Sequence, residues 1–452
     1  MLKVPELLAP AGTHEQLEAA LLYGADAVYL GGGELSLRAG RPFQGEALTR
    51  ALALCRGAGV KVYYCLNAFP RQNQWRQVEA ALEVLGQARP DALIIADAGV
   101  LHAARRQCPH IPVHLSTQAN TGNAASAAFW ADQGVTRVNL ARELPLTQIR
   151  AIRQSLRHSH PALAVECFVH GALCLALSGQ CLLSAWLQDR PANEGRCTQP
   201  CRYKYRKMRG APSLHGAMDV PESVVVEEAL RPHTPLWEVT QHRPDGTGEC
   251  GDQGDFAAIW SPEDICLIRF LPWFTRTGVD SLKIEGRMRT GGYVAHAVDV
   301  YRTALDALRL GVPAERTKGE AELRATATRA LSTGFFLPRR QCRPSAGALA
   351  RTAAALPPVG VAHALPLLAR VEEQVRPQSW KCSVRGRWEA TRPVSLVLPH
   401  MRRPVLQPED YYLENAKGEK VSTVHSGTTA VLHCQNGQDW GLVAGVYVRA
   451  CA

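Results

Sequence analysis

Along the first two thirds of the chain, short apolar runs alternate with longer segments in which apolar residues recur at helical spacing. Eight runs have the length and composition of buried strands: 6–10, 27–31, 61–67, 92–97, 111–116, 137–141, 163–171 and 281–286. Amphipathic stretches such as 15–22, 45–57 and 76–86 lie between them, and each ends near a glycine, as helices commonly do. Eight strands with intervening helices predict an α/β fold, a (β/α)8 barrel of the TIM type.

The competing α/β fold is an open doubly wound sheet, in which a GxGxxG turn normally follows the first strand. Here that turn reads Pro10-Ala-Gly-Thr, which lacks the pattern, so we expect the barrel. The last two strands are about 110 residues apart, far more than one loop and one helix require. This spacing predicts an insertion at about 172–275, before the last strand and at the C-terminal mouth of the barrel, where barrel enzymes have their active sites.

The rest of the chain suggests a second domain. Residues 1–338 are expected to form the barrel with its insertion, and 339–361, rich in Arg, Pro, Ala and Gly, a linker. From 362 to 452 the pattern changes to short strands and turns, which predicts a small all-β barrel domain. The strands expected there are 380–388, 394–398, 411–414, 429–434 and 441–448, with hairpin turns at Asn415 and Asn436.

Three predicted barrel strands carry polar side chains at alternate positions, which share one face. They are Lys283, Glu285 and Arg287 in the eighth strand, His114, Ser116 and Gln118 in the fifth, and Glu166, Phe168 and His170 in the seventh. Because charged groups cannot face the apolar helix layer without a large free-energy cost, we expect them to point inward, towards the mouth. An internal ion-pair network is the plain alternative, but recurrence over several strands favours an active site.

The residues expected at the mouth form two groups. The candidate catalytic residues are His114, His170 and Glu285, and the histidines are the best proton-transfer candidates because the ordinary imidazole pKa lies near neutrality. The candidate substrate-binding residues are Arg38, Asn67, Gln118, Asn120, Arg142, Lys283 and Arg287. Their cationic members would suit an anionic ligand, since guanidinium groups bind carboxylates through paired hydrogen bonds.

Four of the fourteen cysteines lie in a single 28-residue stretch of the predicted insertion: Cys174, Cys181, Cys197 and Cys201. Four thiolates in one loop can hold zinc or an iron–sulfur cluster. Zinc sites usually come as two close pairs, and the wide gap between the first two cysteines argues mildly against zinc. Four unrelated buried thiols are the remaining alternative. We expect most of the other cysteines to be small core residues.

Basic and aromatic residues alternate directly after the last of these cysteines. They are Arg202, Tyr203, Lys204, Tyr205, Arg206 and Lys207. Such residues can bind a single-stranded or flipped nucleotide through phosphate contacts and base stacking. A solvent-exposed strand of alternating charge is the alternative, but the position beside the cysteines and the barrel mouth favours RNA. The formal net charge of +10 also favours a polyanionic partner.

The N-terminal segment carries Glu6, Glu15 and Glu18 where an export signal would need an apolar core, so no export signal is expected. The stretch 168–187 is about as apolar as a membrane span, but His170, Ser178 and Gln180 interrupt it. We therefore expect no membrane association and a cytoplasmic location, with reduced cysteines.

Several motifs together resemble a known family. They are Glu6-Leu-Leu-Ala-Pro-Ala-Gly, Gly24-Ala-Asp-Ala-Val-Tyr, His114-Leu-Ser-Thr-Gln-Ala-Asn, Phe168-Val-His-Gly-Ala-Leu-Cys, Ser178-Gly-Gln-Cys and Ser281-Leu-Lys-Ile-Glu-Gly-Arg. Nearly the whole chain is similar to the collagenase-like "peptidase" family of unknown catalytic type. It looks most like the branch that hydroxylates tRNA, which shares the Cys197-Thr-Gln-Pro-Cys-Arg pair and the C-terminal Glu414-Asn-Ala-Lys-Gly.

The resemblance implies an oxygen-independent hydroxylase that converts the wobble uridine of certain tRNAs to 5-hydroxyuridine, with prephenate as a required metabolite. It also implies a [4Fe-4S] cluster on Cys174, Cys181, Cys197 and Cys201, and a tRNA anticodon stem-loop as the partner. Arg142, Lys283 and Arg287 would then bind the prephenate carboxylates. The basic segment after Cys201 and the β domain would bind the stem-loop.

Three rival functions make different predictions. A true peptidase would hydrolyse peptides regardless of iron, although the sequence offers no nucleophile or metal-bound water for it. A non-catalytic RNA-binding protein would hold a structural zinc. A hydroxylase of the same family could act on ribosomal RNA or on a ubiquinone precursor.

Overall fold

The computed structural model describes most of the chain. The described residues are 2–33, 35–36, 43–174, 176–203, 263–313, 315–337, 365–435, 437–438 and 440–451, with the backbone of strands at 205–209, 223–228 and 235–240. The predicted linker and Arg38 lie outside these residues. In the described part of the chain, no helix is both long and apolar enough to cross a membrane.

Eight parallel strands form a closed ring. They are β1 (Glu6–Pro10), β2 (Ala27–Leu30), β3 (Lys61–Leu66), β4 (Ala92–Ile95), β5 (Val113–Leu115), β6 (Arg137–Asn139), β7 (Ala164–Ala172) and β12 (Ser281–Ile284). Strand β12 pairs with both β7 and β1, which closes the barrel. The (β/α)8 prediction is therefore confirmed, and each of the eight predicted runs coincides with one strand.

Helices surround the ring and pack their apolar faces against it. They are α1 (His14–Leu22), α2 (Glu46–Gly57), α3 (Trp75–Ala88), α4 (Ala98–Gln107), α5 (Ala124–Asp132), α6 (Leu146–Ser159), α8 (Leu271–Thr277) and α9 (Gly291–Leu310). Four begin at a short polar side chain, Thr13, Asp97, Asn123 or Thr290, that accepts a hydrogen bond from a backbone N–H of the first turn. Such caps satisfy backbone donors that would otherwise lack a partner, so they fix where each helix starts.

The inside of the ring contains an apolar cluster and a group of buried polar side chains. Leu8, Tyr29, Tyr63, Cys65 and Ile94, from β1 to β4, belong to a separate apolar cluster. Strands β5, β6, β7 and β12 carry the buried polar side chains, among them His114, Arg137, Asn139, Glu166 and Lys283. The polar residues at alternate positions of the sequence therefore correspond to inward-facing side chains of these four strands, with the exception of His170 described below.

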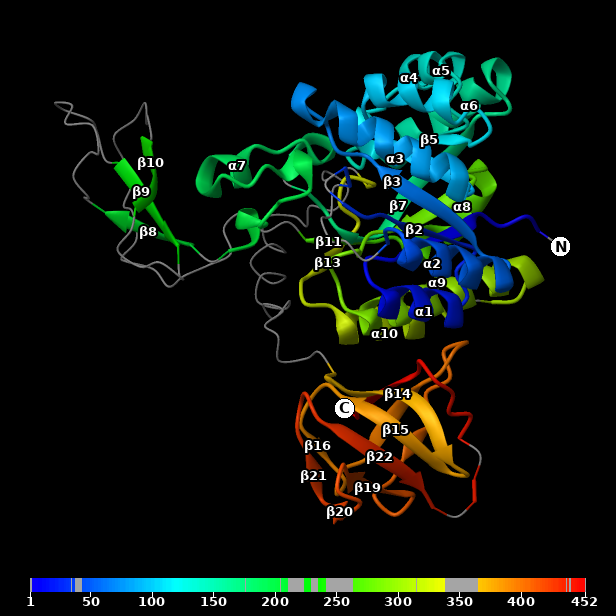
Figure 1. Cartoon of the computed structure of the whole chain (residues 1–452), viewed down its shortest axis with the longest axis vertical. Helices are drawn as coiled ribbons and strands as arrows, with labels where there is room; N and C mark the ends of the chain where they lie inside the picture. Colours follow the sequence, from blue (N-terminus) through cyan, green and yellow to red (C-terminus); the bar gives the residue numbers. More distant parts are fainter. Residues whose placement is uncertain are drawn as a thin grey trace, which may run out of the picture.

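The chain between β7 and α8 forms the long insertion. It contains the short helix α7 (Leu183–Gln188) and an antiparallel sheet of β8 (Tyr205–Arg209), β9 (Ser223–Glu228) and β10 (Pro235–Thr240). In Figure 1, α7 and this sheet extend to one side of the barrel. The insertion returns through β11 (Asp264–Cys266), which pairs with the end of β7 and with β13 (Leu331–Ser332).

The C-terminal domain is all-β, as predicted. Its main sheet is antiparallel and has the order β18–β17–β23–β14–β15–β22–β19–β20, which forms a half-barrel rather than a closed one. These strands are β14 (Leu367–Arg376), β15 (Ser379–Val384), β17 (Val394–Val397), β18 (Val405–Leu406), β19 (Tyr411–Asn415), β20 (Lys420–Val421), β22 (Thr429–Cys434) and β23 (Tyr447–Ala450). The predicted turn at Asn415 joins β19 to β20, whereas Asn436 lies outside the described residues.

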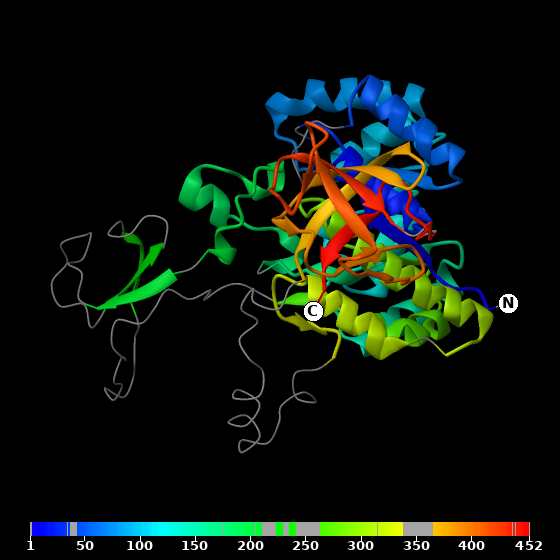
Figure 2. The same cartoon turned by 90° about the horizontal axis from the view of Figure 1, so that it is seen from below.

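The half-barrel packs against α1, α9 and α10 (Arg316–Thr326), and Figure 2 shows it in front of the barrel when seen from below. Arg403 contacts Asp299 of α9 at 2.7 Å, and Arg449 contacts Glu322 of α10 at 2.7 Å. Tyr23 donates a hydrogen bond to the Val397 carbonyl at 2.5 Å. These buried polar contacts fix the half-barrel to the barrel.

Candidate active site

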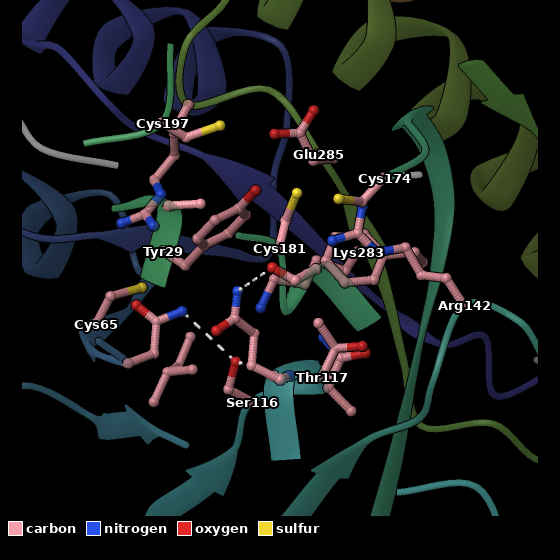
Figure 3. A pocket seen from close by; sticks show the side chains of 18 of the residues that line it. Tyr29, Cys65, Ser116, Thr117, Arg142, Cys174, Cys181, Cys197, Lys283 and Glu285 are labelled. Atoms are coloured by element: carbon pink, nitrogen blue, oxygen red, sulfur yellow. Dashed lines mark hydrogen bonds between the residues drawn. The ribbon is translucent and has the colours of Figure 1, made fainter. Parts of the chain in front are cut away.

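A pocket opens at the carboxyl ends of the barrel strands, between the ring and the cysteine-bearing insertion (Figure 3). Its volume is about 110 Å³, well above the ~10–15 Å³ that one water molecule needs. Ten of the sequence-predicted residues line it: Asn67, Gln118, Arg142, Cys174, Cys181, Cys197, Cys201, Lys283, Glu285 and Arg287. The strand ends and the insertion therefore meet where the sequence placed the active site.

The eighth strand and the loop after it supply three charged residues, Lys283, Glu285 and Arg287, all of which line the pocket. Each is at most 8 % exposed. The Lys283 ammonium lies 4.4 Å from the ring centre of Tyr29, a pocket residue of β2. The alternation of charged and apolar residues in this strand thus predicted the inward face correctly.

Lys283 belongs to an internal ion-pair network below the pocket. Its Nζ lies 3.1 Å from Glu166 Oε1, and Arg137 bridges Glu166 and Glu6 at 3.3 and 2.7 Å. Burial raises the pKa of the Glu166 carboxyl, but Lys283 and Arg137 outweigh burial, so the pKa falls below its ordinary value. Glu166 is therefore ionised and neutralises Lys283, which makes this part of the charged face structural.

Two arginines at the pocket have no ion-pair partner among the described residues. Arg142 lies over the ring of Phe168 at 4.5 Å, and its Nη1 donates to the Ala172 carbonyl at 2.7 Å. Arg287 donates from Nη1 to the Ser36 hydroxyl at 2.8 Å. Because no described carboxylate neutralises either guanidinium, the pocket retains positive charge suited to an anionic ligand.

The structure corrects the orientation predicted for His170. Lys283 pairs with Phe168, but the next residue, Ile284, pairs with His170, so β7 has one extra residue, a β-bulge. His170 consequently faces the helix layer, where its ring lies 5.8 Å from Tyr293 and 5.5 Å from the Tyr301 ring. Burial lowers the pKa of His170 to about 3, and it does not line the pocket.

His114 faces the barrel interior, as predicted, but lies below the pocket and does not line it. Its ring contacts Tyr63 edge-on at 4.5 Å. Burial, followed by the charge of Arg137, lowers its pKa well below the ordinary value, so the imidazole is neutral. The structure therefore brings neither histidine to the pocket wall, and Glu285 is the remaining candidate catalytic residue there.

The cysteine segment is attached to the barrel by several hydrogen bonds. The Ser178 backbone N–H and hydroxyl donate to Glu143 at 2.5 and 3.1 Å. Gln180 donates to the Gln118 carbonyl at 2.7 Å, and Gln118 donates back to the Gly179 carbonyl at 3.4 Å. Gln118 thus holds the segment as well as lining the pocket. Asn120, two residues later, has left-handed backbone geometry and does not line the pocket.

All four clustered cysteines are free thiols and line the same pocket. The sulfur atoms of Cys174, Cys181 and Cys197 are directed into it (Figure 3). Burial raises the pKa of the Cys181 and Cys201 thiols, and the charge of the neighbouring cysteines raises it further.

The four thiols fit an iron–sulfur cluster in donor type, number and shared cavity. Their coordination geometry is not formed here, because no three His, Cys, Asp or Glu side chains of the described residues are arranged to hold a metal ion.

Sequence reasoning missed several residues that line the pocket, among them Tyr29, Cys65 and Asn139. Tyr29 and Cys65 lie in apolar runs and were not distinguished from core residues, although both have the inward parity of their strands. Asn139 has the same parity as Arg137 and donates to Glu166 at 2.9 Å. Inward parity near the carboxyl end of each strand is the signal that could have found all three.

The basic segment is described only in part. The Tyr203 hydroxyl donates to the Thr198 carbonyl at 3.0 Å, and Arg202 contacts Gln199, so both are anchored beside Cys201. Tyr205, Arg206 and Lys207 lie in β8, and Lys204 lies outside the described residues.

The protein is therefore a closed β/α barrel with a pocket at its C-terminal mouth that four cysteines line. The chain belongs to peptidase family U32, whose model matches residues 12–345. It is 35 % identical over 353 residues to "tRNA hydroxylation protein P" of Escherichia coli, and 34 % identical over 345 residues to the protein of that name in Haemophilus influenzae, with 74 % of each chain covered in both cases. It is also 30 % identical over 346 residues to a "Collagenase" of Porphyromonas gingivalis, again with 74 % of each chain covered.

Proposed function

We propose that this protein hydroxylates the wobble uridine of tRNA to 5-hydroxyuridine in a prephenate-dependent, oxygen-independent reaction. The observation that carries the proposal is the pocket in which four cysteines face Arg142, Glu285 and Arg287. Peptide hydrolysis changes no oxidation state, so it needs no redox-capable donor set. Replacing the C5–H of uridine by C5–OH without molecular oxygen removes two electrons from the base, so an oxygen donor must be reduced in exchange, and in this proposal prephenate is that donor: its C–OH becomes C–H as the uridine C–H becomes C–OH. The similarity to tRNA hydroxylation proteins supports tRNA as the substrate.

In this proposal Cys174, Cys181, Cys197 and Cys201 hold a [4Fe-4S] cluster. When bound, the cluster supplies one-electron redox chemistry beside the substrate. The attachment of the segment through Ser178 and Gln180 holds these cysteines over the barrel mouth. The remaining steps belong to the protein's own side chains.

Arg142 and Arg287 bind the two carboxylates of prephenate, since each has a guanidinium without a described ion-pair partner. Lys283 contributes less to this binding because Glu166 neutralises it. Glu285 is placed on the pocket wall to accept or donate the proton that moves when uridine is hydroxylated. The Phe168 and Tyr29 rings, which line the same pocket, hold its cations in place: Arg142 lies over Phe168 and Lys283 over Tyr29.

The segment from Arg202 to Lys207 and the β half-barrel contact the anticodon stem-loop in this proposal. Arg202 and Tyr203 are anchored next to Cys201, so RNA bound by this segment lies beside the pocket. The uridine then turns out of the loop and enters the barrel mouth.

A peptidase remains the second candidate because of the collagenase relative. A hydrolase of the serine type needs a hydroxyl that a histidine activates and a peptide can reach. Ser379 lies 2.8 Å from His433, but Ser379 is only 5 % exposed and lies within the half-barrel sheet. That hydroxyl is therefore closed to a peptide, and this pair does not favour peptidase activity.

The test is anaerobic purification followed by a visible spectrum and assays of iron and sulfide. We expect a brown protein with about four iron and four sulfide per chain, as a [4Fe-4S] cluster requires. Cys174→Ser should lose the cluster, whereas Cys65→Ala, which removes a thiol of the same pocket outside the ligand set, should keep it. A colourless protein with one zinc would refute the redox proposal.

A further inference from the structure

The three most exposed large apolar side chains of the described residues lie within ten residues of one another, on the cysteine segment. They are Leu177, Leu182 and Trp186, with exposed fractions of 63, 76 and 81 %. Soluble proteins seldom gather large apolar groups on the surface unless a ligand or partner covers them. These three residues are not among the site residues described above.

The exposed side chains lie on the outer side of the segment that forms one pocket wall. Cys181 and Leu183 line the pocket, while their neighbours Leu182 and Trp186 face solvent. Ser184 is fully buried and hydrogen-bonds to the backbone N–H of Thr198 at 3.1 Å. The buried side of α7 is therefore fixed, and Trp186 is presented on a stable support next to the pocket.

The charge around Trp186 indicates what kind of molecule covers it. Arg190 and Arg196 of the same segment are exposed, and neither forms an ion pair with a described residue. Glu194 is neutralised by Arg71 at 2.9 Å, which leaves Asp189 as the one acidic side chain of α7 and its flanks without a described ion pair. The Arg190 Nε donates to the Arg196 carbonyl at 3.3 Å, which holds the two arginines of this segment together without neutralising them. An exposed indole on the same short segment as two arginines without a described ion pair matches a nucleobase and its phosphates better than an apolar protein surface.

We propose that Trp186 is the stacking platform for an unpaired RNA base that neighbours the nucleotide in the pocket, with Leu182 supporting the base and Arg190 and Arg196 contacting its phosphates. This inference rests on the proposed function, because the target nucleotide is taken to enter the same pocket. It assigns α7, rather than only the segment after Cys201, to RNA recognition. Trp186 acts here in binding and positioning and not in the chemical step.

The test compares the binding of two fluorescently labelled RNAs to the cluster-loaded full chain by anisotropy. One is an anticodon stem-loop and the other is the same stem as a blunt duplex without unpaired bases. Trp186→Ala should weaken stem-loop binding about 5- to 100-fold, as expected for the loss of one stacked base, and leave duplex binding unchanged. Trp186→Phe should restore most of the affinity because a ring can still stack.

Phe129→Ala is the matched control, since Phe129 is an exposed aromatic residue (55 %) on α5, outside the cysteine segment. It should bind both RNAs as the wild type does. Replacing one loop base next to the target uridine by an abasic site should remove the effect of Trp186→Ala, because the stacking partner is then absent.

The possible failures are distinguishable. Equal stem-loop binding by wild type and Trp186→Ala, with tRNA still hydroxylated, would overturn this inference and leave the proposed function intact. A change in oligomeric state on Trp186→Ala with unchanged RNA binding would overturn it in favour of a second copy as the occupant. A wild-type protein that binds neither RNA would overturn this inference together with the proposed function.

Discussion

Lys283 Nζ lies 3.1 Å from Glu166 Oε1 at the floor of the pocket, and both side chains are almost fully buried. Each stabilises the other's charge in a region that water barely reaches. Removing one member of such a pair leaves a buried charge without compensation, which typically destabilises a protein by about 3–5 kcal/mol.

We therefore expect Lys283→Met to lower the free energy of unfolding by about 3 kcal/mol, because Arg137 still partly compensates Glu166. The double variant Lys283→Met/Glu166→Gln should be more stable than the sum of the two single changes predicts. Urea denaturation of the three variants measures this. Strictly additive losses would show that the two residues do not interact as described.

The pocket arginines should control affinity for the anionic co-substrate. Arg142→Gln or Arg287→Gln should raise the KM for prephenate about 10- to 100-fold, since each removes a charge-assisted contact of ~1.5–3 kcal/mol, and should leave the cluster intact. Arg150→Gln is the control, because Arg150 lies over Trp273, which does not line the pocket. Unchanged KM values in both pocket variants would place the prephenate elsewhere.

Glu285 and His170 should differ sharply in their effect on catalysis. Glu285→Gln should lower kcat by about 10²–10⁴-fold if its carboxyl moves the proton. His170→Gln should lower kcat by less than about 3-fold and leave the pH profile unchanged, because a group whose pKa is about 3 stays neutral over the assay range. A pH profile that loses a limb in His170→Gln would contradict the position described for this side chain.

Acid should weaken the attachment of the half-barrel through Glu322. Burial raises its pKa, but the charges and hydrogen bonds of Arg449 and Arg403 lower it more strongly, to about 2. A depressed carboxyl pKa stabilises the fold above the unfolded-state value of ~4.3 and loses this contribution as pH falls towards 2, up to about 3 kcal/mol in total. When the pH is lowered from 6 to 3, the melting temperature of Glu322→Gln should therefore fall less than that of the wild type. Parallel curves for the two proteins would refute this role.

Much of this architecture could be predicted from hydrophobic periodicity, because buried strands and amphipathic helices impose it directly. The inward face of β12 followed from simple alternation. The same rule failed at His170 in β7, the barrel strand that pairs with β12. A β-bulge adds a single residue there, and this residue leaves no trace in the pattern of polar positions. Strand β14 was missed because its second half, Glu372 to Arg376, is polar apart from Val375 and is half-exposed or exposed.

The pocket shows a similar limit. Cys174, Cys181, Cys197 and Cys201 could be grouped because they are close in sequence, whereas Cys65 joins them only through the fold. Asp97 illustrates the opposite case: it follows a strand and looks like a site residue, but its carboxylate caps α4 by accepting from the Val100 N–H at 2.9 Å. Spacing along the sequence is therefore enough to identify candidate ligands within one loop. To predict which residues meet across the barrel, the register of all eight strands must be known.

The most direct test of the central claim is mass spectrometry of tRNA nucleosides from a strain that lacks this gene and any other uridine-hydroxylating pathway. Returning the wild-type gene should restore 5-hydroxyuridine derivatives at the wobble position, and the Cys174→Ser gene should not. Wobble uridine that stays unmodified with the wild-type gene, or that is hydroxylated equally with both genes, would contradict the account.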